Sequence, residues 1–166
     1  MNLKFTPATP DDAPALAALH TAVADDFTRR YGPGFWSHAA SERGVLFQMR
    51  HSRVLIASRG KTIVATLRLA NKKPWAIDVN YFTPVKKPIY LTGMAVAPKL
   101  QRQGIGRRLM VHAIAEAKSW PADAIRLDAY DAAIGAGRFY ASCGFRETAR
   151  VVYKKNPLIY YELILS

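Results

Sequence analysis

Residues 90–109, YLTGMAVAPKLQRQGIGRRL, constrain the fold of this chain more than any other stretch. Strand-favouring residues lead to a turn at Pro98, after which Gly104 and Gly106 open a new helix. A glycine has no Cβ, so the backbone can approach a ligand closely, and the first N–H groups of a helix have no intrahelical acceptor. These donors are surrounded by fixed positive charge that suits a pyrophosphate, from Arg102, Arg107 and Arg108. The stretch therefore predicts a cradle for a phosphorylated cofactor.

Two better-known phosphate motifs do not fit this turn. A dinucleotide fingerprint needs a third glycine three residues after Gly106, where the chain has Leu109. A Walker loop needs Gly-Lys followed by Ser or Thr, and no such sequence follows. Because glycines at a helix start also serve tight packing alone, a purely structural turn stays open at this point.

Several motifs in order along the chain resemble one family. The motif QRQGIG at residues 101–106 is similar to the Gln/Arg-x-x-Gly-x-Gly/Ala signature of the GNAT superfamily of N-acetyltransferases, and MAVAP at 94–98 resembles its fourth strand. A second block, residues 125–145, joins the strand IRLDAY to GRFY and CGF, and resembles the family's tyrosine-bearing helix. Residues 160–163, YYEL, resemble its last strand. About half of the chain matches, and two blocks together are far more specific than either alone.

The resemblance implies the acyl-CoA N-acyltransferase fold. This is a single three-layer α+β (mixed α/β) domain, here residues 1–166, with a central, mostly antiparallel sheet of six to seven strands. Its fourth and fifth strands are splayed, and about four helices flank the sheet. The implied cofactor is acetyl-CoA, with coenzyme A as product. The residues that match the cofactor-binding positions are Met94, Ala95, Val96, Gln101, Arg102, Gln103, Gly104, Ile105, Gly106, Arg107, Asp131 and Phe139.

Two residues are candidates for the catalysis of acetyl transfer. Tyr140 matches the family tyrosine that can protonate the leaving thiolate, a role its phenol proton can fill. A lysine-like amine has a pKa of about 10.4 and must lose a proton before it attacks. Asp128 stands where some family members carry a carboxylate base on the fifth strand, although it can equally serve to neutralise an arginine. Asp78 is the reserve candidate for the base.

One cofactor position departs from the family pattern. Asp131 stands where the family often has an asparagine, and the gap to Tyr140 is two residues longer than usual, with an extra turn at residues 135–137.

The acceptor is expected to bind between two stretches that mix aromatic residues with glycine or proline. One is the long loop of residues 71–88, called the lip below, and the other is the connection of residues 29–36. The candidate acceptor-binding residues are Trp36, Trp75, Asp78 and Tyr81. The lip holds four lysines, so an amine that carries a carboxylate or phosphate is favoured over a polyamine, with a protein amine also open.

Composition limits the alternatives. With 166 residues, half of them hydrophobic, and no leader or membrane-span pattern, we expect one soluble cytoplasmic domain, as a monomer or homodimer. The net charge is +12, and residues 71–108 hold eight Lys or Arg against one acid. No nucleic-acid partner is expected, because these arginines sit on a glycine turn and not along one helix face. The four histidines show no metal-ligand spacing, so no metal is predicted.

A second class of function stays open from the residues alone. A non-catalytic module could keep the cradle and use bound acyl-CoA for regulation. Such a module needs neither a tyrosine nor a nearby acid, and the presence of Tyr140 and Asp128 favours the enzyme.

Periodicity and turn residues predict the elements of secondary structure. Strands are expected at residues 3–6, 53–58, 62–69, 124–130, 145–153 and 158–165, in addition to the fourth strand described above. Helices are expected from Thr9 to before Gly32, at 35–47, at 104–119 and at 136–142.

Overall fold

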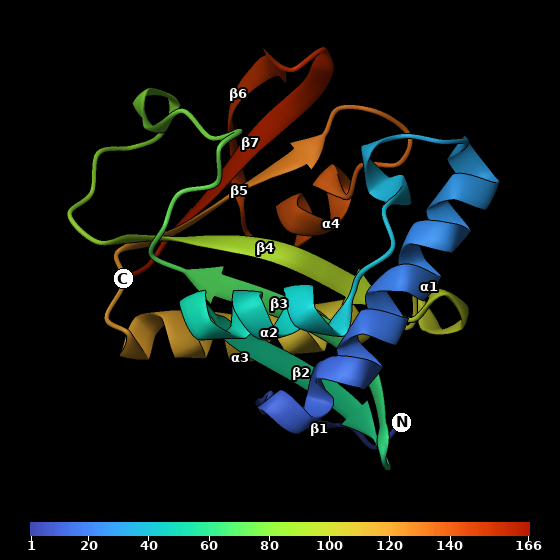
Figure 1. Ribbon diagram of the computed structural model, residues 1–166. Coiled ribbons are helices and arrows are strands. Elements are labelled where there is room, and N and C mark those ends of the chain that lie inside the picture. Colours follow the sequence, from blue (N-terminus) through green and yellow to red (C-terminus); the bar gives the residue numbers. More distant parts are fainter. The chain divides into compact units, whose positions relative to one another are not determined.

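A computed structural model describes all 166 residues, and it has seven strands and four α-helices (Figure 1). In chain order they are β1 (Lys4–Pro7), α1 (Ala13–Tyr31), α2 (Glu42–His51), β2 (Arg53–Arg59), β3 (Thr62–Ala70), β4 (Pro88–Val96), α3 (Ile105–Ser119), β5 (Ala124–Tyr130), α4 (Gly137–Ser142), β6 (Arg146–Tyr153) and β7 (Asn156–Ile164). The strand order is β1-β2-β3-β4-β5-β7-β6. Strands β4 and β5 pair in parallel, whereas the pairs β1–β2, β2–β3, β5–β7 and β6–β7 are antiparallel, so the predicted mostly antiparallel mixed α/β sheet is confirmed.

Two compact units make up the chain. The first comprises Met1–Leu69 and Gly93–Ala113, and the second Ala70–Thr92 and Ile114–Ser166. Strand β4 and helix α3 each contribute residues to both units.

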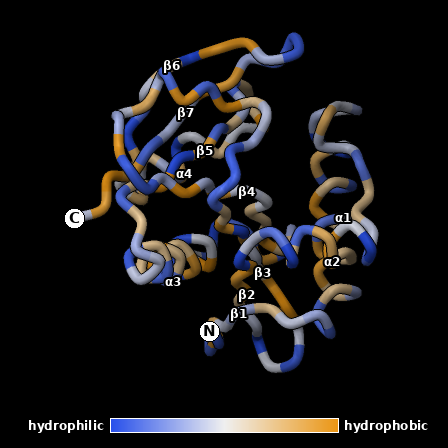
Figure 2. Tube along the Cα trace, turned by 60° about the vertical axis from the view of Figure 1, so that its left-hand side comes forward, coloured by the Kyte–Doolittle hydropathy of each residue, from blue (hydrophilic) through white to orange (hydrophobic).

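The first unit packs α1 and α2 on one face of the β1-β2-β3 sheet. In Figure 1, α2 passes in front of β2 and β3. Leu16 of α1, Val45 of α2 and Ile56 of β2 belong to one buried cluster. Figure 2 shows hydrophobic and hydrophilic segments alternating along α1, as expected for a helix with one buried stripe. Phe5 of β1 stacks on His112 of α3, which is how the first turns of α3 join this unit.

The second helix differs from the sequence prediction. Residues 35–47 were expected to be helical, but Phe35–Ser37 is a 3₁₀ turn and α2 begins at Glu42. The physical reason is the cap, because the Ser41 hydroxyl accepts a hydrogen bond of 3.0 Å from the N–H of Gly44. The other predicted helices and strands agree with the structure to within a few residues at each end.

The second unit contains the parting of β4 and β5. Their parallel pairing covers only Pro88–Tyr90 against Ala124–Arg126, although β5 continues to Tyr130. Beyond this point β5 keeps only its β7 neighbour, with Asp128 opposite Tyr160. The predicted splay of the fourth and fifth strands is therefore present.

Buried polar groups fasten the lip to the strands of the second unit. The Tyr160 hydroxyl accepts a hydrogen bond from the N–H of Asp78 at 3.1 Å and donates one to the carbonyl of Ala76. Further along the lip, the carbonyl of Thr83 accepts a hydrogen bond of 2.8 Å from Arg126. The lip is thus an ordered segment packed on β5 and β7.

Candidate active site

The turn before α3 has the geometry of an anion cradle. Gly104 has a φ of +84°, a conformation that favours glycine, and no atom lies within 4 Å of the position where a Cβ would stand. The N–H of Arg108 bonds back to the carbonyl of Gly104 at 3.1 Å. The N–H groups of Gly104, Ile105 and Gly106 precede this bond and therefore have no intrahelical acceptor. The Ile105 side chain is buried and anchors the turn, while Gly104 is exposed.

The side chains around the cradle differ in their contacts and exposure. Gln101 braces the turn, because its amide donates a hydrogen bond of 3.1 Å to the carbonyl of Val96. Arg102, with a φ of 62°, and Arg107 are exposed next to the helix start. Arg108 lies over the ring of Phe5 and donates to the carbonyl of Met1, so it is directed toward β1.

This donor set fits the pyrophosphate of coenzyme A. A row of backbone N–H groups at a helix start, open space beside Gly104 and exposed guanidinium groups are what a phosphorylated ligand requires.

Asp128 lies on the face of the second unit that the lip covers. Residues paired across antiparallel strands point to the same side, and its partner Tyr160 packs with Ile77 and Phe82 of the lip. Burial raises the pKa of Asp128 above its usual range. Asp128 forms no ion pair, and its role as the base stays a prediction.

Tyr140 is a buried residue of α4. Its ring lies among Phe139, Phe145 and Tyr161, with centroids 5.3, 5.9 and 6.2 Å away. Burial raises the pKa of Tyr140 well above its usual value, and the charge of Asp128 raises it further. The phenol is therefore protonated at neutral pH and able to donate.

Close approaches of the backbone account for the glycines in the extra turn between β5 and α4. A Cβ at Gly135 would stand 1.8 Å from the carbonyl oxygen of Tyr130, and one at Gly137 would stand 2.4 Å from the Tyr161 hydroxyl. At Gly135 the neighbouring atom belongs to the backbone and leaves no room for a side chain, whereas at Gly137 it is the end of the Tyr161 side chain. Asp131, at the start of this segment, lies 3.6 Å from Arg150, and its role toward a cofactor stays a prediction.

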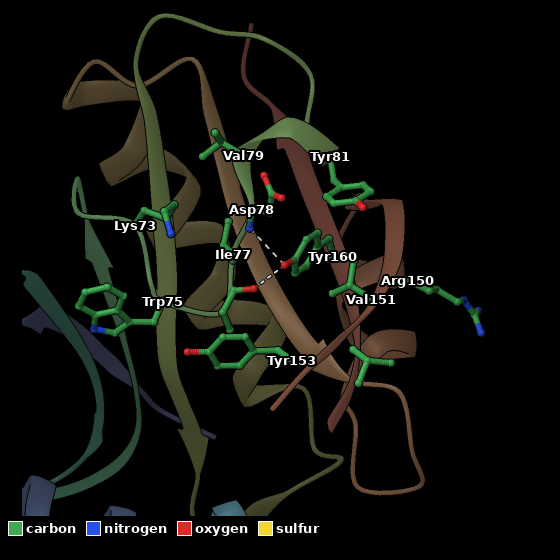
Figure 3. A pocket seen from close by; sticks show the side chains of 12 residues that line it. Lys73, Trp75, Ile77, Asp78, Val79, Tyr81, Arg150, Val151, Tyr153 and Tyr160 are labelled. Atoms are coloured by element: carbon green, nitrogen blue, oxygen red, sulfur yellow. Dashed lines mark hydrogen bonds between the residues drawn. The ribbon is translucent and has the colours of Figure 1, made fainter. Parts of the chain in front are cut away.

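A pocket of about 600 Å³ lies within the second unit (Figure 3). Its walls are lip residues between Lys73 and Tyr81, the Arg150–Tyr153 part of β6, and Tyr160. In Figure 3 the Tyr153 hydroxyl points toward Trp75, while Arg150 extends away from the pocket. Trp75 is 85% exposed.

Three of the four predicted acceptor residues line this pocket: Trp75, Asp78 and Tyr81. Trp36 does not, since it belongs to the first unit, where its indole N–H donates to the carbonyl of Gly32 at 2.9 Å. Sequence reasoning missed the contribution of β6, because nothing in the strand's alternation shows which loop packs beside it.

Sequence reasoning also missed a cationic cluster in the first unit. Arg68 of β3 donates a hydrogen bond of 2.8 Å to the Gln48 side chain of α2. A Cβ at Gly93 would lie 2.6 Å from the Arg68 guanidinium, so this charge lies directly against β4. Burial, together with the charge of Arg68, lowers the pKa of His20 on α1. The strand's alternation identifies none of these contacts, because they join four separate elements.

The fold lacks two further features that would bear on function. No group of three or more His, Cys, Asp or Glu side chains is arranged to hold a metal ion. None of the helices combines the length and apolar character that crossing a membrane would require.

The fold and the cradle define a class of protein, and comparison with known families agrees. The profile of the Acetyltransferase (GNAT) family matches residues 17–145, which is most of the chain. The chain therefore belongs to the GNAT family of acetyltransferases. It is an acyltransferase, and its acyl donor is acetyl-CoA. A search of curated proteins found no match.

Solved structures of the same fold come from several organisms. The ribosomal-protein-S18-alanine N-acetyltransferase from Escherichia coli has a TM-score of 0.75 at 18% identity, covering 99% of this chain and 95% of that one. The yncA structure from Salmonella typhimurium, with its cofactor acetyl-CoA, has a TM-score of 0.73 at 17% identity, covering 99% and 94%. The PaiA N-acetyltransferase from Thermoplasma acidophilum, in complex with coenzyme A, has a TM-score of 0.75 at 13% identity, covering 98% and 100%. At these identities the likeness extends to the fold alone.

Proposed function

We propose that this protein is an N-acetyltransferase that moves an acetyl group from acetyl-CoA to a primary amine by direct attack in a ternary complex. The observation that carries the proposal is the phenol of Tyr140, buried, protonated and influenced by the charge of Asp128. A module that only binds acyl-CoA has no use for such a pair. The activity is assigned to residues 1–166 as a single domain, in the cytoplasm.

The cradle of the first unit holds the cofactor. The N–H groups of Gly104, Ile105 and Gly106 bind the pyrophosphate, and Arg102 and Arg107 add positive charge. Met94 and Val96 of β4 offer backbone groups to the pantetheine arm and the thioester, as the family resemblance implies. Gln103, Ala95, Asp131 and Phe139 complete the proposed cofactor-binding residues.

Protons move at two places during transfer. The neutral amine forms a bond to the thioester carbonyl carbon, and the C–S bond then breaks. Tyr140 gives its proton to the departing thiolate. Asp128 accepts the proton that the amine nitrogen loses, directly or through water, and its raised pKa brings it closer to working pH than an ordinary aspartate. Solvent then restores the proton on Tyr140.

The pocket of the second unit is a candidate binding region for the body of the acceptor. A volume of about 600 Å³ suits a small molecule, and its wall combines aromatic rings with Lys73 and Asp78. An acidic amino-acid-like amine fits this lining and the lysine-rich lip better than a polyamine does. Two of the solved structures of this fold are named as acetyltransferases of a ribosomal-protein alanine, which makes a protein N-terminus the second candidate acceptor.

An acceptor panel tests the proposal. The purified protein is incubated with acetyl-CoA and with amino acids, polyamines, aminoglycosides and short peptides, and thiol release is measured together with the mass of each amine. A gain of one acetyl group on an amine supports the proposal. Tight coenzyme A binding without transfer to any amine would leave the non-catalytic module as the better account.

A further inference from the structure

The Arg68 guanidinium is held in place from two sides. Gln48 accepts a hydrogen bond of 2.8 Å from its Nη1 atom. On the other side, the backbone of β4 at Gly93 is so close that a Cβ there would stand 2.6 Å from Nη1 and 2.8 Å from Cζ. Gly93 has a φ of 63°, which favours glycine for a second reason. The charge thus lies between α2 and β4, directed by its hydrogen bond to Gln48.

No acidic side chain compensates Arg68. Its hydrogen-bond partner is an amide, and no ion pair involves it. Asp26, the buried acid of the first unit, is already engaged by Arg29 and Arg30. Burial lowers the pKa of Arg68 and no carboxylate counteracts that effect. Removing a charge from water without a partner is costly, so a half-buried and fixed cation is suited to an anionic ligand.

His20 does not add a second charge to the cluster. Burial lowers the pKa of His20, and the nearby charge of Arg68 lowers it further, so the imidazole is neutral at pH 7. The site therefore presents one positive charge, which matches a monoanion. A carboxylate matches the planar fork of a guanidinium with two parallel hydrogen bonds.

The position on β4 indicates which reactant carries the anion. The phosphates of coenzyme A have the cradle at Gly104 with its own donors and arginines. Gly93 lies on the part of β4 next to Met94, where the family resemblance places the thioester. An anion held at Arg68 is therefore part of the acceptor, near the carbon that its amine attacks.

We propose that Arg68, positioned by Gln48 against β4 at Gly93, binds the carboxylate of the acceptor, so that the substrate is a primary amine carrying a carboxylate. This inference rests on the proposed acetyl transfer and names its substrate class. The rival role for the same side chain is polarisation of the thioester, which would serve every acceptor alike.

Matched acceptors separate these roles. The probes are α-, β- and ω-amino acids, each paired with its own carboxamide, assayed with acetyl-CoA by thiol release. For the best pair, the wild-type protein should prefer the carboxylate, and Arg68→Gln should raise KM for the carboxylate about 10- to 100-fold while leaving the carboxamide nearly unchanged. Arg59→Gln, an exposed arginine of β2, is the control for loss of one charge and should keep the preference. Coenzyme A affinity and the circular dichroism spectrum should be the same in all three proteins.

Three outcomes would overturn the inference. Equal use of carboxylate and carboxamide by the wild type, or an unchanged preference in Arg68→Gln, would remove the carboxylate site. An equal loss of kcat on both members of the pair would assign Arg68 to the thioester. Each of these leaves acetyl transfer itself intact, whereas transfer to no amine at all would count against the proposed function.

A titration without turnover tests the same contact. Nuclear magnetic resonance follows His20 as the pH is varied, in the presence of coenzyme A and either the amino acid or its carboxamide. A carboxylate bound to Arg68 offsets its positive charge, so the pKa of His20 should rise with the amino acid and stay unchanged with the carboxamide. An identical titration with both ligands would contradict the inference even if no acceptor were acetylated.

Discussion

The N–H of Thr83 donates a hydrogen bond of 3.1 Å to the carboxylate of Glu162, which is only 1% exposed. The Thr83 hydroxyl and Arg146 bind the same carboxylate, Arg146 at 2.6 Å. Together these bonds fasten the end of the lip to β7. Burial by itself raises the pKa of Glu162, but the bonds from Thr83 and Arg146 outweigh it and leave that pKa below its usual value.

The first prediction concerns the stability that this anchor provides. Glu162→Gln should lower the free energy of unfolding at pH 7 by about 1 to 3 kcal/mol, because a charged acceptor of buried hydrogen bonds is lost. Since the folded pKa is depressed, this stability is present above the unfolded value of about 4.3 and is lost as the pH falls through the folded pKa. Urea unfolding at pH 7 and at pH 3 measures it, and the difference from wild type should shrink at pH 3. Glu147→Gln removes an exposed carboxylate of β6 paired with Arg150, and it should cost less than about 1 kcal/mol. Equal effects of the two substitutions would mean that the lip is not held by Glu162.

The second prediction concerns the cradle. Gly104→Asp places a negative side chain beside the phosphates, so calorimetry should show coenzyme A affinity falling at least about 100-fold. Gly60→Asp is the matched control, because Gly60 also has a positive φ, +61°, and an open Cβ position, but it lies in the β2–β3 turn. Both variants carry the same backbone strain, of about 1 kcal/mol. Retained affinity in the Gly104 variant would exclude the cradle as the phosphate site.

The third prediction concerns the proton for the thiolate. Tyr140→Phe should lower kcat by about 10²- to 10⁴-fold with coenzyme A affinity unchanged, because only the phenol proton is removed. Tyr161→Phe, the neighbouring ring at 6.2 Å, is the control and should stay within a few-fold of wild type. Steady-state kinetics with the best acceptor from the panel decide. A wild-type rate in the Tyr140 variant would make this tyrosine structural.

The fourth prediction concerns Asp128, whose replacement by asparagine should lower activity but raise stability at pH 8. Because burial raises its pKa, kcat/KM should rise with pH through that raised value, and Asp128→Asn should lower activity and remove this limb of the profile. The same substitution should increase the stability of the folded protein at pH 8. Because the pKa of Asp128 is higher in the folded protein than in the unfolded one, its contribution to stability is fully present below the unfolded pKa. That contribution is lost as the pH rises through the folded pKa, and an asparagine, which does not ionise, avoids the loss.

Melting temperatures at pH 8 and pH 4 test the predicted effect of Asp128→Asn on stability. The Asp128→Asn variant should melt above wild type at pH 8, and the gap should narrow toward pH 4. A variant less stable than wild type at pH 8, with an unchanged pH–rate profile, would show that Asp128 is a structural carboxylate after all.

Local patterns in the sequence were enough to predict the elements to which we assign the cofactor site. IRLDAY alternates between two faces, and β5 occupies Ala124–Tyr130 as expected. The paired glycines mark the start of α3, and the φ of +84° at Gly104 favours a glycine there. Even the extra turn before α4 could be recognised, although its cause, the approach of Gly135 to the Tyr130 carbonyl, needs coordinates.

Contacts between distant segments could not be predicted in the same way. The strand pattern of residues 145–153 predicts β6 but not that Val151 and Tyr153 face the lip. The strand that contains Arg68 was predicted, but the closeness of its side chain to Gly93 and Gln48 depends on how β3, β4 and α2 pack. The start of α2 was missed for a local reason. The helix was expected to begin at the aromatic residues Phe35 and Trp36, but it begins after the N-cap Ser41.

The last prediction concerns the pocket beside the lip. Trp75 is 85% exposed and lines the pocket, so an acceptor bound there would cover its ring. If an acceptor packs on this ring, Trp75→Ala should raise KM for the acceptor about 10-fold or more, from the loss of roughly 1.4 kcal/mol of apolar contact, with little change in coenzyme A affinity. Phe47→Ala is the control, because Phe47 of α2 is also exposed, at 56%, but does not line this pocket. Steady-state kinetics and calorimetry on both variants measure the two quantities separately. Equal KM values in the two variants would mean that Trp75 is an ordinary exposed ring and that the acceptor binds outside this pocket.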